Sequence, residues 1–74
     1  MNYRDRIIAD PQIMLGKPVI KGTRITVELI LRKLSQKVIF EDLLKSYPHL
    51  TLDDIYAVLA YSADVISKEE VIAC

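Results

Sequence analysis

The apolar residues of this chain change their spacing at Thr26, and this change limits the folds that the chain can adopt. Between residues 27 and 34, apolar side chains recur three and four positions apart, which is the spacing of one face of a helix. The Thr26 hydroxyl can accept a hydrogen bond from an unpaired N–H of the first turn, and Glu28 lies where the helix dipole favours an anion. We therefore predict a helix over residues 27–36.

Before Thr26 the pattern is that of short extended segments. Residues 6–9 contain two isoleucines and are followed by Asp10-Pro11, which opens a turn, and residues 19–20 lie between Pro18 and Gly22. Pro18 has no backbone N–H, so a strand at this point is short or lies at an edge. This part of the chain predicts a small β element rather than a full sheet.

A short second helix is predicted over residues 40–46. Its apolar residues fall on one side, and Pro48 ends the pattern because proline cannot continue a helix. Ile39 occupies the cap position, where serine or aspartate would serve better, so the start of this helix is weakly specified.

The third predicted helix, residues 52–65, has the strongest local signals in the chain. Thr51 can cap it, Asp54 follows in a near-capping-box arrangement, and Leu50 can pack on Ile55 as a hydrophobic staple. A short turn joins this helix to the second one, and two helices connected in this way predict a helix-turn-helix. A further short turn is expected to start at Ser67. The apolar residues that predict the core-facing side of the third helix are Ile55, Leu59, Ala63 and Ile66.

The predicted fold is mainly α: a three-helix, helix-turn-helix-like bundle with a short β N-terminal arm. Its 74 residues form one domain, with the arm over 1–25, the three helices over 26–66 and a tail over 67–74. A single core of this size supplies little net stability, so small domains often gain stability from a second subunit or a partner. With 51% hydrophobic residues, the chain is therefore predicted to form a homodimer or to bind another protein.

Cysteine usage and hydropathy bear on the compartment. The chain has one cysteine, Cys74, which forms no internal disulfide, so nothing indicates an oxidising environment. The charged N-terminus has no apolar segment behind it, unlike a signal peptide, and no apolar run approaches the length of a membrane span. We expect a cytoplasmic protein with no membrane association.

The net charge of zero conceals an asymmetry between the two halves. Residues 1–37 carry eight basic against three acidic side chains, whereas residues 38–74 carry two against seven. The third predicted helix has no lysine or arginine, and its first turn carries Asp53 and Asp54, which phosphates would repel. Any nucleic-acid contact is therefore expected from the basic half, while a solvated basic face is the competing interpretation. The predicted contacts are Arg4, Arg6, Lys17, Lys21, Arg24, Arg32 and Lys33.

Several chemical functions lack the residues they require. The two glycines do not form a phosphate-binding loop, because Thr23 follows Gly22 directly where that loop has a lysine. His49, the one histidine, lies in a predicted turn, and the acidic pairs lie in first turns of helices, where the dipole explains them. No set of residues has the spacing of metal ligands. We expect no enzymatic activity, no cofactor and no metal.

Two blocks of the sequence resemble a known family. The strings GKPVIKGTRI (residues 16–25) and YPHLTLDDI (residues 47–55) are similar, in order and spacing, to the domain-of-unknown-function family four hundred and thirty-three (DUF433), over about residues 7–63. This resemblance implies a three-helix, helix-turn-helix-like fold with a short β arm. It also implies an antitoxin role, since such proteins are often encoded beside a PIN-like nuclease toxin.

The sequence departs from the family pattern at several turns. Leu15 stands where a glycine commonly precedes Gly16, and Thr26 stands where proline is common. Lys37 and Ile39 replace a glycine and a serine that would close the first helix and cap the second. We expect the turn between these helices to leave apolar side chains exposed for a partner.

The resulting hypothesis is a non-enzymatic, dimeric, antitoxin-like protein that binds and neutralises a PIN-like toxin, with DNA as a further possible ligand. The alternatives are a stand-alone helix-turn-helix DNA-binding regulator and an interaction module that binds no nucleic acid. The predicted partner contacts are Val38 and Ile39, in the turn between helices, and Val71 and Ile72, in the tail.

Overall fold

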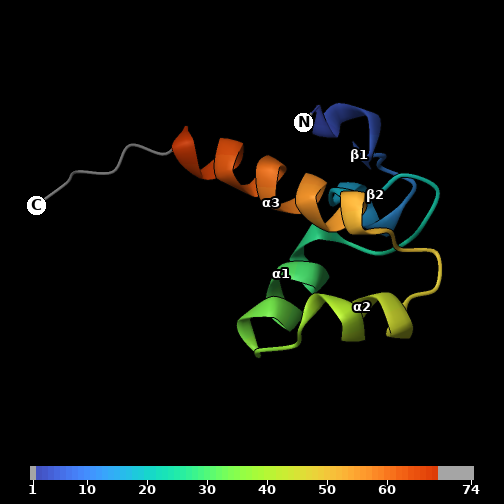
Figure 1. The fold of residues 1–74 in the computed structure, drawn as a ribbon. Coiled ribbons are helices and arrows are strands. Elements are labelled where there is room, and N and C mark those ends of the chain that lie inside the picture. Colours follow the sequence, from blue (N-terminus) through green and yellow to red (C-terminus); the bar gives the residue numbers. More distant parts are fainter. Residues whose placement is uncertain (1, 69–74) are drawn as a thin grey trace, which may run out of the picture.

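The structure, a computed structural model, describes residues 2–68 and contains three helices and a two-stranded antiparallel sheet near the N-terminus (Figure 1). The predicted mainly α fold with a short β arm is confirmed. In chain order the elements are a 3-10 turn at Tyr3–Asp5, β1 (Ile7–Ile8), a 3-10 turn at Met14–Gly16, β2 (Val19–Ile20), α1 (Val27–Ser35), α2 (Phe40–Ser46) and α3 (Leu52–Ser67).

The arm packs against the helices instead of standing apart from them. Strand β1 pairs with β2 through Ile7–Ile20 and Ile8–Val19, and Val19 also bridges to Thr26 at the entry to α1. Gly22 has a φ of +80°, which lets the chain reverse between β2 and α1. Because Ile7, Val19 and Ile20 are buried, the arm contributes part of the hydrophobic core.

Helix α1 begins and ends through identifiable local contacts. Thr26 caps it as predicted, since its hydroxyl accepts a hydrogen bond from the Leu29 N–H at 3.0 Å. At the other end the Lys37 N–H donates to the Leu34 carbonyl and the Val38 N–H donates to the Lys33 carbonyl, which is the Schellman arrangement. Lys37 occupies the left-handed position of this motif, with a φ of +68°, where glycine is usual.

A second turn also holds non-glycine residues in the left-handed region. Met14, Leu15 and Gly16 have φ values of +50°, +59° and +83°, so the turn before β2 uses three left-handed residues in succession, two of which are not glycine. Leu15 therefore adopts, at a cost in backbone strain, a conformation that glycine would adopt freely.

Helices α2 and α3 form the helix-turn-helix pair. Ile39 provides no side-chain cap for α2, as its residue type predicts. Thr51 and Asp54 form a complete capping box at the start of α3. Helix α3 extends to Ser67, two residues beyond its predicted end. The further turn expected to start at Ser67 falls mostly on residues outside the described range; Ser67 itself is the last residue of α3, and its hydroxyl donates to the Asp64 carbonyl.

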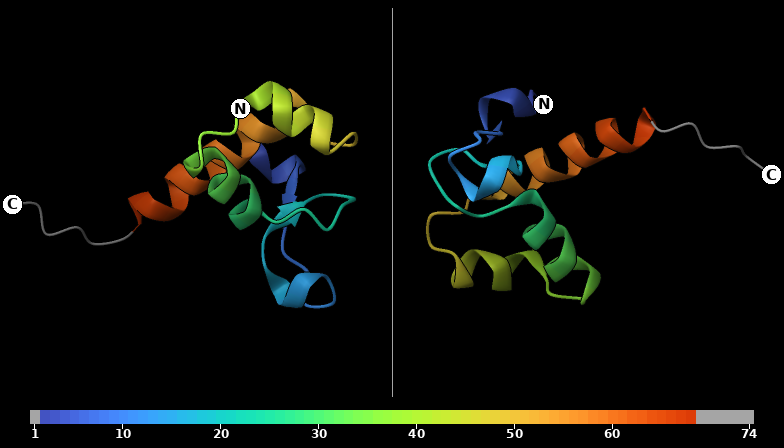
Figure 2. Two further views of the ribbon diagram at one scale, coloured as in Figure 1. Left: turned by 90° about the horizontal axis from the view of Figure 1, so that it is seen from below. Right: turned by 180° about the vertical axis from the view of Figure 1, so that it is seen from behind.

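The core lies where α1, α2 and the first half of α3 meet the strands. Its fully buried side chains come from each of these elements: Val19, Ile30, Leu43, Ile55 and Val58. Figures 1 and 2 show that the C-terminal half of α3 projects beyond α2 and the strands. This projection leaves α3 with exposed apolar side chains in its second half.

Candidate functional site

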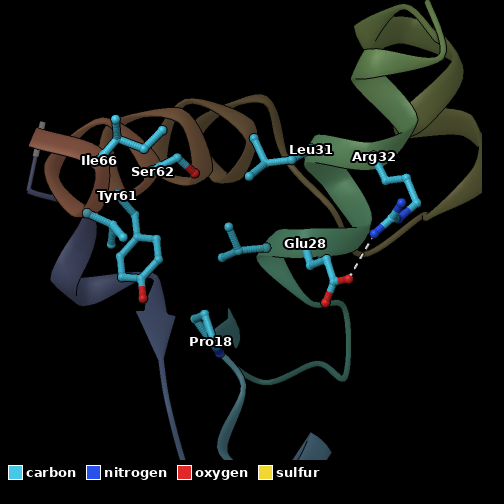
Figure 3. A pocket seen from close by; sticks show the side chains of 9 residues that line it. Pro18, Glu28, Leu31, Arg32, Tyr61, Ser62 and Ile66 are labelled. Atoms are coloured by element: carbon cyan, nitrogen blue, oxygen red, sulfur yellow. Dashed lines mark hydrogen bonds and ion pairs between the residues drawn. The ribbon is translucent and has the colours of Figure 1, made fainter. Parts of the chain in front are cut away.

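A groove lies between α1 and the C-terminal half of α3. Its volume is about 480 Å³ and most of its lining is apolar. Leu31 on α1 and Tyr61 on α3 face the space between the two helices, and Pro18 closes one side (Figure 3). We call this space the α1–α3 groove. It is lined by Pro18, Val27, Glu28, Leu31, Arg32, Tyr61, Ser62, Val65 and Ile66.

The open end of the groove exposes apolar side chains to solvent. Val65 is 43% exposed and Ile66 is 58% exposed, although both belong to a packed helix. The predicted core-facing side of α3 is partly wrong here, since Leu59 and Ile66 lie outside the core while Ala57 and Val58 lie inside it. Leu59 directly follows the buried Val58 and is exposed because it faces away from the core, whereas Ile66 lies in the last turns of α3, beyond the elements that cover the rest of the helix.

One side of the α1–α3 groove carries a small charge network. The Glu28 carboxylate accepts a hydrogen bond from the Lys17 ammonium at 3.1 Å and another from the Arg32 guanidinium at 3.0 Å. The hydrogen bond from Lys17, followed by the one from Arg32, lowers the pKa of Glu28 below its ordinary value. Together, Lys17, Glu28 and Arg32 form a polar edge of the groove that carries both positive and negative charge.

The opposite wall is held by aromatic contacts to the N-terminal 3-10 turn. The Tyr3 and Tyr61 rings meet edge to face with centroids 5.5 Å apart, and the Tyr3 hydroxyl donates to the Asp64 carboxylate at 2.7 Å. That hydrogen bond raises the pKa of Tyr3 above its ordinary value. The chain start therefore fixes the projecting half of α3 and the orientation of the Tyr61 ring.

The structure divides the predicted nucleic-acid contacts into two groups. Three of them form ion pairs within the chain: Lys17 and Arg32 with Glu28, and Arg6 with Asp54 at 3.1 Å and with Asp53 at 3.5 Å. The others form no ion pair with any residue in 2–68. Arg4 in this group lies over the Tyr3 ring, 5.8 Å from its centroid. The remaining members are Lys21, Arg24 and Lys33.

Lys21 and Arg24 flank the Gly22 turn, and both are exposed. Arg24 also lines a shallow depression with His49, which brings this turn beside the turn between α2 and α3. The first turn of α3 itself offers phosphates little, because Asp53 and Asp54 occupy it and Asp54 is buried in the capping box. DNA binding through the basic half stays a prediction.

The predicted partner contacts fall in different environments. Ile39 is 57% exposed in the turn between α1 and α2, as its position predicts. Val38 beside it is half-buried and packs against the core. Val71 and Ile72 lie outside the described residues.

The groove was not predicted from the sequence. Leu31 belongs to the apolar face that predicts α1, and Ile66 belongs to the apolar pattern that predicts the core side of α3, so each resembles a core residue; Val65 lies outside that pattern. One feature of the sequence could have predicted the groove. The apolar pattern of the third helix continues to Ile66, and two short helices and two short strands are too small to cover a helix of that length.

Other classes of site are not seen in the described part of the chain. Among residues 2–68, no three His, Cys, Asp or Glu side chains come together as metal ligands. Over the same residues, no helix has both the length and the apolar composition needed to cross a membrane.

Two of three comparisons with known proteins name the same family. Residues 7–62 match the family model described as a protein of unknown function, DUF433. An uncharacterized protein of Archaeoglobus fulgidus is 54% identical over 28 residues, which are 38% of this chain and 78% of that protein. The crystal structure of a DUF433 member protein from Anabaena variabilis superposes with a TM-score of 0.81 at 28% sequence identity. That comparison covers 88% of this chain, but the chain spans only 64% of the Anabaena protein.

Proposed function

This chain belongs to DUF433, a family of proteins of unknown function, and we propose that it is a non-enzymatic, antitoxin-like protein that binds and neutralises a PIN-like nuclease toxin. The proposal includes a cytoplasmic homodimer, with DNA as a second ligand of the basic turn at Lys21 and Arg24. The observation that carries it is the α1–α3 groove.

The groove has the features of a protein-binding surface. Its apolar lining and the exposed Val65 and Ile66 side chains match the helix-in-groove mode, in which a partner helix inserts apolar anchors between two helices. The Glu28 network at its edge adds polar groups of both signs at the rim, which is typical of protein interfaces. The occupant that fits is therefore an amphipathic helix of the toxin.

The alternative of a stand-alone DNA-binding regulator draws support from one observation. Lys21 and Arg24 are exposed on one turn and form no ion pair with residues 2–68, so both are available to phosphates. The acidic first turn of α3 weighs against helix insertion into a major groove. For this reason we place the protein partner first.

Co-expression with the product of the adjacent gene tests the proposal. We expect that product to arrest growth alone, and this chain to restore growth and to form a complex that survives size-exclusion chromatography. The Val65→Lys variant should lose both effects, since it places a charge in the apolar groove. Helix α3 itself should be retained, because the dipole favours a lysine near the C-terminal end of a helix.

The comparison variant is Ile39→Lys, which adds the same charge at an exposed β-branched residue in the other predicted contact surface. If Ile39→Lys breaks the complex and Val65→Lys does not, the partner binds the turn between α1 and α2 and the groove assignment is wrong. A neighbouring product that shows no toxicity alone argues for the regulator.

A further inference from the structure

The Met14–Gly16 turn carries the most exposed large apolar side chain among residues 2–68. Leu15 is 94% exposed, and the next highest value for a large apolar residue is 58%, at Ile66. Its φ of +59° is one that glycine adopts freely and leucine adopts at a cost. Neither the core nor the backbone therefore accounts for a leucine at this position, and residues held at such a cost are concentrated at functional sites.

Hydrogen bonds hold this turn in one conformation. The Gly16 N–H donates to the Ile13 carbonyl at 3.1 Å. The Lys17 N–H donates to the Met14 carbonyl at 3.2 Å. The turn thus presents Leu15 on an ordered backbone, so a ligand that buries this side chain loses less binding free energy to ordering of the chain.

The Met14–Gly16 turn lies beside the basic Gly22 turn. Ile13, at the start of the first turn, lines a shallow depression together with Gly22 and Arg24 of the second. Figure 2 shows both turns on the side of the molecule away from the C-terminal end of α3. A ligand that meets one turn can therefore meet the other.

The charges of these two turns are mainly positive. The charged side chains of the stretch, one acidic and three basic, are Asp10, Lys17, Lys21 and Arg24. Lys21 and Arg24 form no ion pair with the described part of the chain. Lys17 shares the single carboxylate of Glu28 with Arg32, which leaves that network one positive charge in excess. The ligand that complements an apolar tip with this charge is a polyanion.

We propose that Leu15 is an apolar wedge for double-stranded DNA, which enters the minor groove and kinks the duplex between two base pairs. Lys21 and Arg24 contact the phosphates beside it. The inference rests on DNA as the second ligand in the proposed function, and it requires no toxin. It adds the groove, the inserted residue and the deformation of the duplex.

The chemistry of the two turns fits this ligand better than other polyanions. Proteins that kink DNA from the minor groove insert Leu, Met, Ile, Phe or Pro between base pairs and hold the backbone with basic side chains. Met14 and Leu15 are both of this type. A wedge on the arm also does not require the acidic first turn of α3 to enter a groove. An anionic membrane surface fits less well, because stable attachment there needs a wide apolar face or a lipid anchor.

Binding to two short duplexes, one fully paired and one with a central T·T mismatch, tests the wedge. The wild-type protein should bind both at low salt, where phosphate contacts are strongest. It should prefer the mismatched duplex, because a mismatched step costs less to unstack. The Leu15→Gly variant should lose this preference and bind the mismatched duplex about tenfold more weakly, which is the order expected for one buried leucine side chain. Fluorescence anisotropy of labelled duplexes measures both affinities.

Energy transfer between dyes at the two ends of the mismatched duplex measures the kink. Saturating wild-type protein should bring the ends closer, as a bend of roughly 20–90° would. Saturating Leu15→Gly should not. The double variant with Lys21→Ala and Arg24→Ala should bind more weakly but still bend the duplex once it is saturated, because it keeps the wedge.

The choice of glycine separates a binding role of Leu15 from a structural one. Glycine relieves the left-handed strain, so the urea midpoint of Leu15→Gly should equal or exceed that of the wild type. Leu15→Asn keeps a side chain that tolerates this conformation but is polar, and it should lose binding in the same way. Leu59→Asn, which removes an exposed leucine from α3, should bind and bend DNA as the wild type does.

Three results would overturn the wedge. The first is unchanged affinity and bending in Leu15→Gly; if the Lys21 and Arg24 double variant still loses affinity, DNA stays a ligand and only the wedge is wrong. The second is a lower urea midpoint for Leu15→Gly, which would give Leu15 a structural role. The third is wild-type protein that binds phosphatidylserine vesicles but neither duplex. Toxin binding in the α1–α3 groove is tested separately by the co-expression experiment.

Discussion

Replacing Asp54 with alanine should destabilise this protein far more than the same change at Asp53, its neighbour in the sequence. The Asp54 side chain is 9% exposed and accepts hydrogen bonds from the Thr51 N–H at 3.0 Å and from the Arg6 guanidinium at 3.1 Å. The Asp53 side chain is 60% exposed and lies 3.5 Å from Arg6. The two residues therefore share a charge and a helical turn but differ in burial and in partners.

The magnitude follows from the groups that lose their acceptor. Hydrogen bonds to charged groups contribute about 1.5–3 kcal/mol each, less where solvent reaches the donor, as it does at the partly exposed Arg6. The Asp54→Ala change should therefore lower the free energy of unfolding by about 2–3 kcal/mol in total, including the lost anion at the start of α3. For a domain of this size, that corresponds to a fall in Tm of roughly 10–20 °C. The Asp53→Ala change should cost less than about 0.5 kcal/mol.

Urea denaturation followed by far-UV circular dichroism measures both values. A double-mutant cycle with Arg6→Ala isolates the Arg6–Asp54 interaction, for which we expect a coupling of about 1 kcal/mol after solvent screening. Equal losses for the Asp53 and Asp54 variants, or a coupling indistinguishable from zero, would refute the assignment of Arg6 to a structural ion pair. Arg6 would then return to the group of basic residues available to nucleic acid.

Three further predictions concern backbone strain, pH and DNA. Lys37→Gly should raise the free energy of unfolding by about 1 kcal/mol in the same assay, since glycine adopts the left-handed conformation at this C′ position without a Cβ penalty. The hydrogen bond from Lys17 lowers the pKa of Glu28, so its stabilising contribution is present above the ordinary glutamate pKa and is lost as the pH falls through the lowered value. Glu28→Gln should accordingly flatten the loss of stability at acid pH, and an unchanged acid limb in thermal scans would contradict this. If the chain binds DNA through the Gly22 turn, replacing Lys21 and Arg24 together with alanine should reduce the slope of log K against log salt by up to about two units. An unchanged slope would exclude this turn as the phosphate contact.

Sequence alone determined the features that depend on neighbours within one turn. The caps at Thr26 and Thr51, the stop before Pro48 and the bounds of α2 all follow from side-chain and backbone groups only a few residues apart. Local hydrogen bonds of this kind depend on residues only a few positions apart, so they can be predicted without knowing the fold. The poor cap at Ile39 was predicted for the same reason.

Tertiary structure decided which of the basic and apolar residues remain available. Arg6 is separated by 48 positions from Asp54, and Lys17 by 11 from Glu28, so their neutralisation depends on how the arm packs against the helices. Leu59 and Ile66 have the same apolar character as Val58, but Leu59 faces away from the core and Ile66 lies where α3 extends past its neighbours, so both are exposed. Burial is a property of what covers a side chain, and that covering comes from distant parts of the chain. The sequence therefore specified the helices, whereas their packing created the groove between α1 and α3.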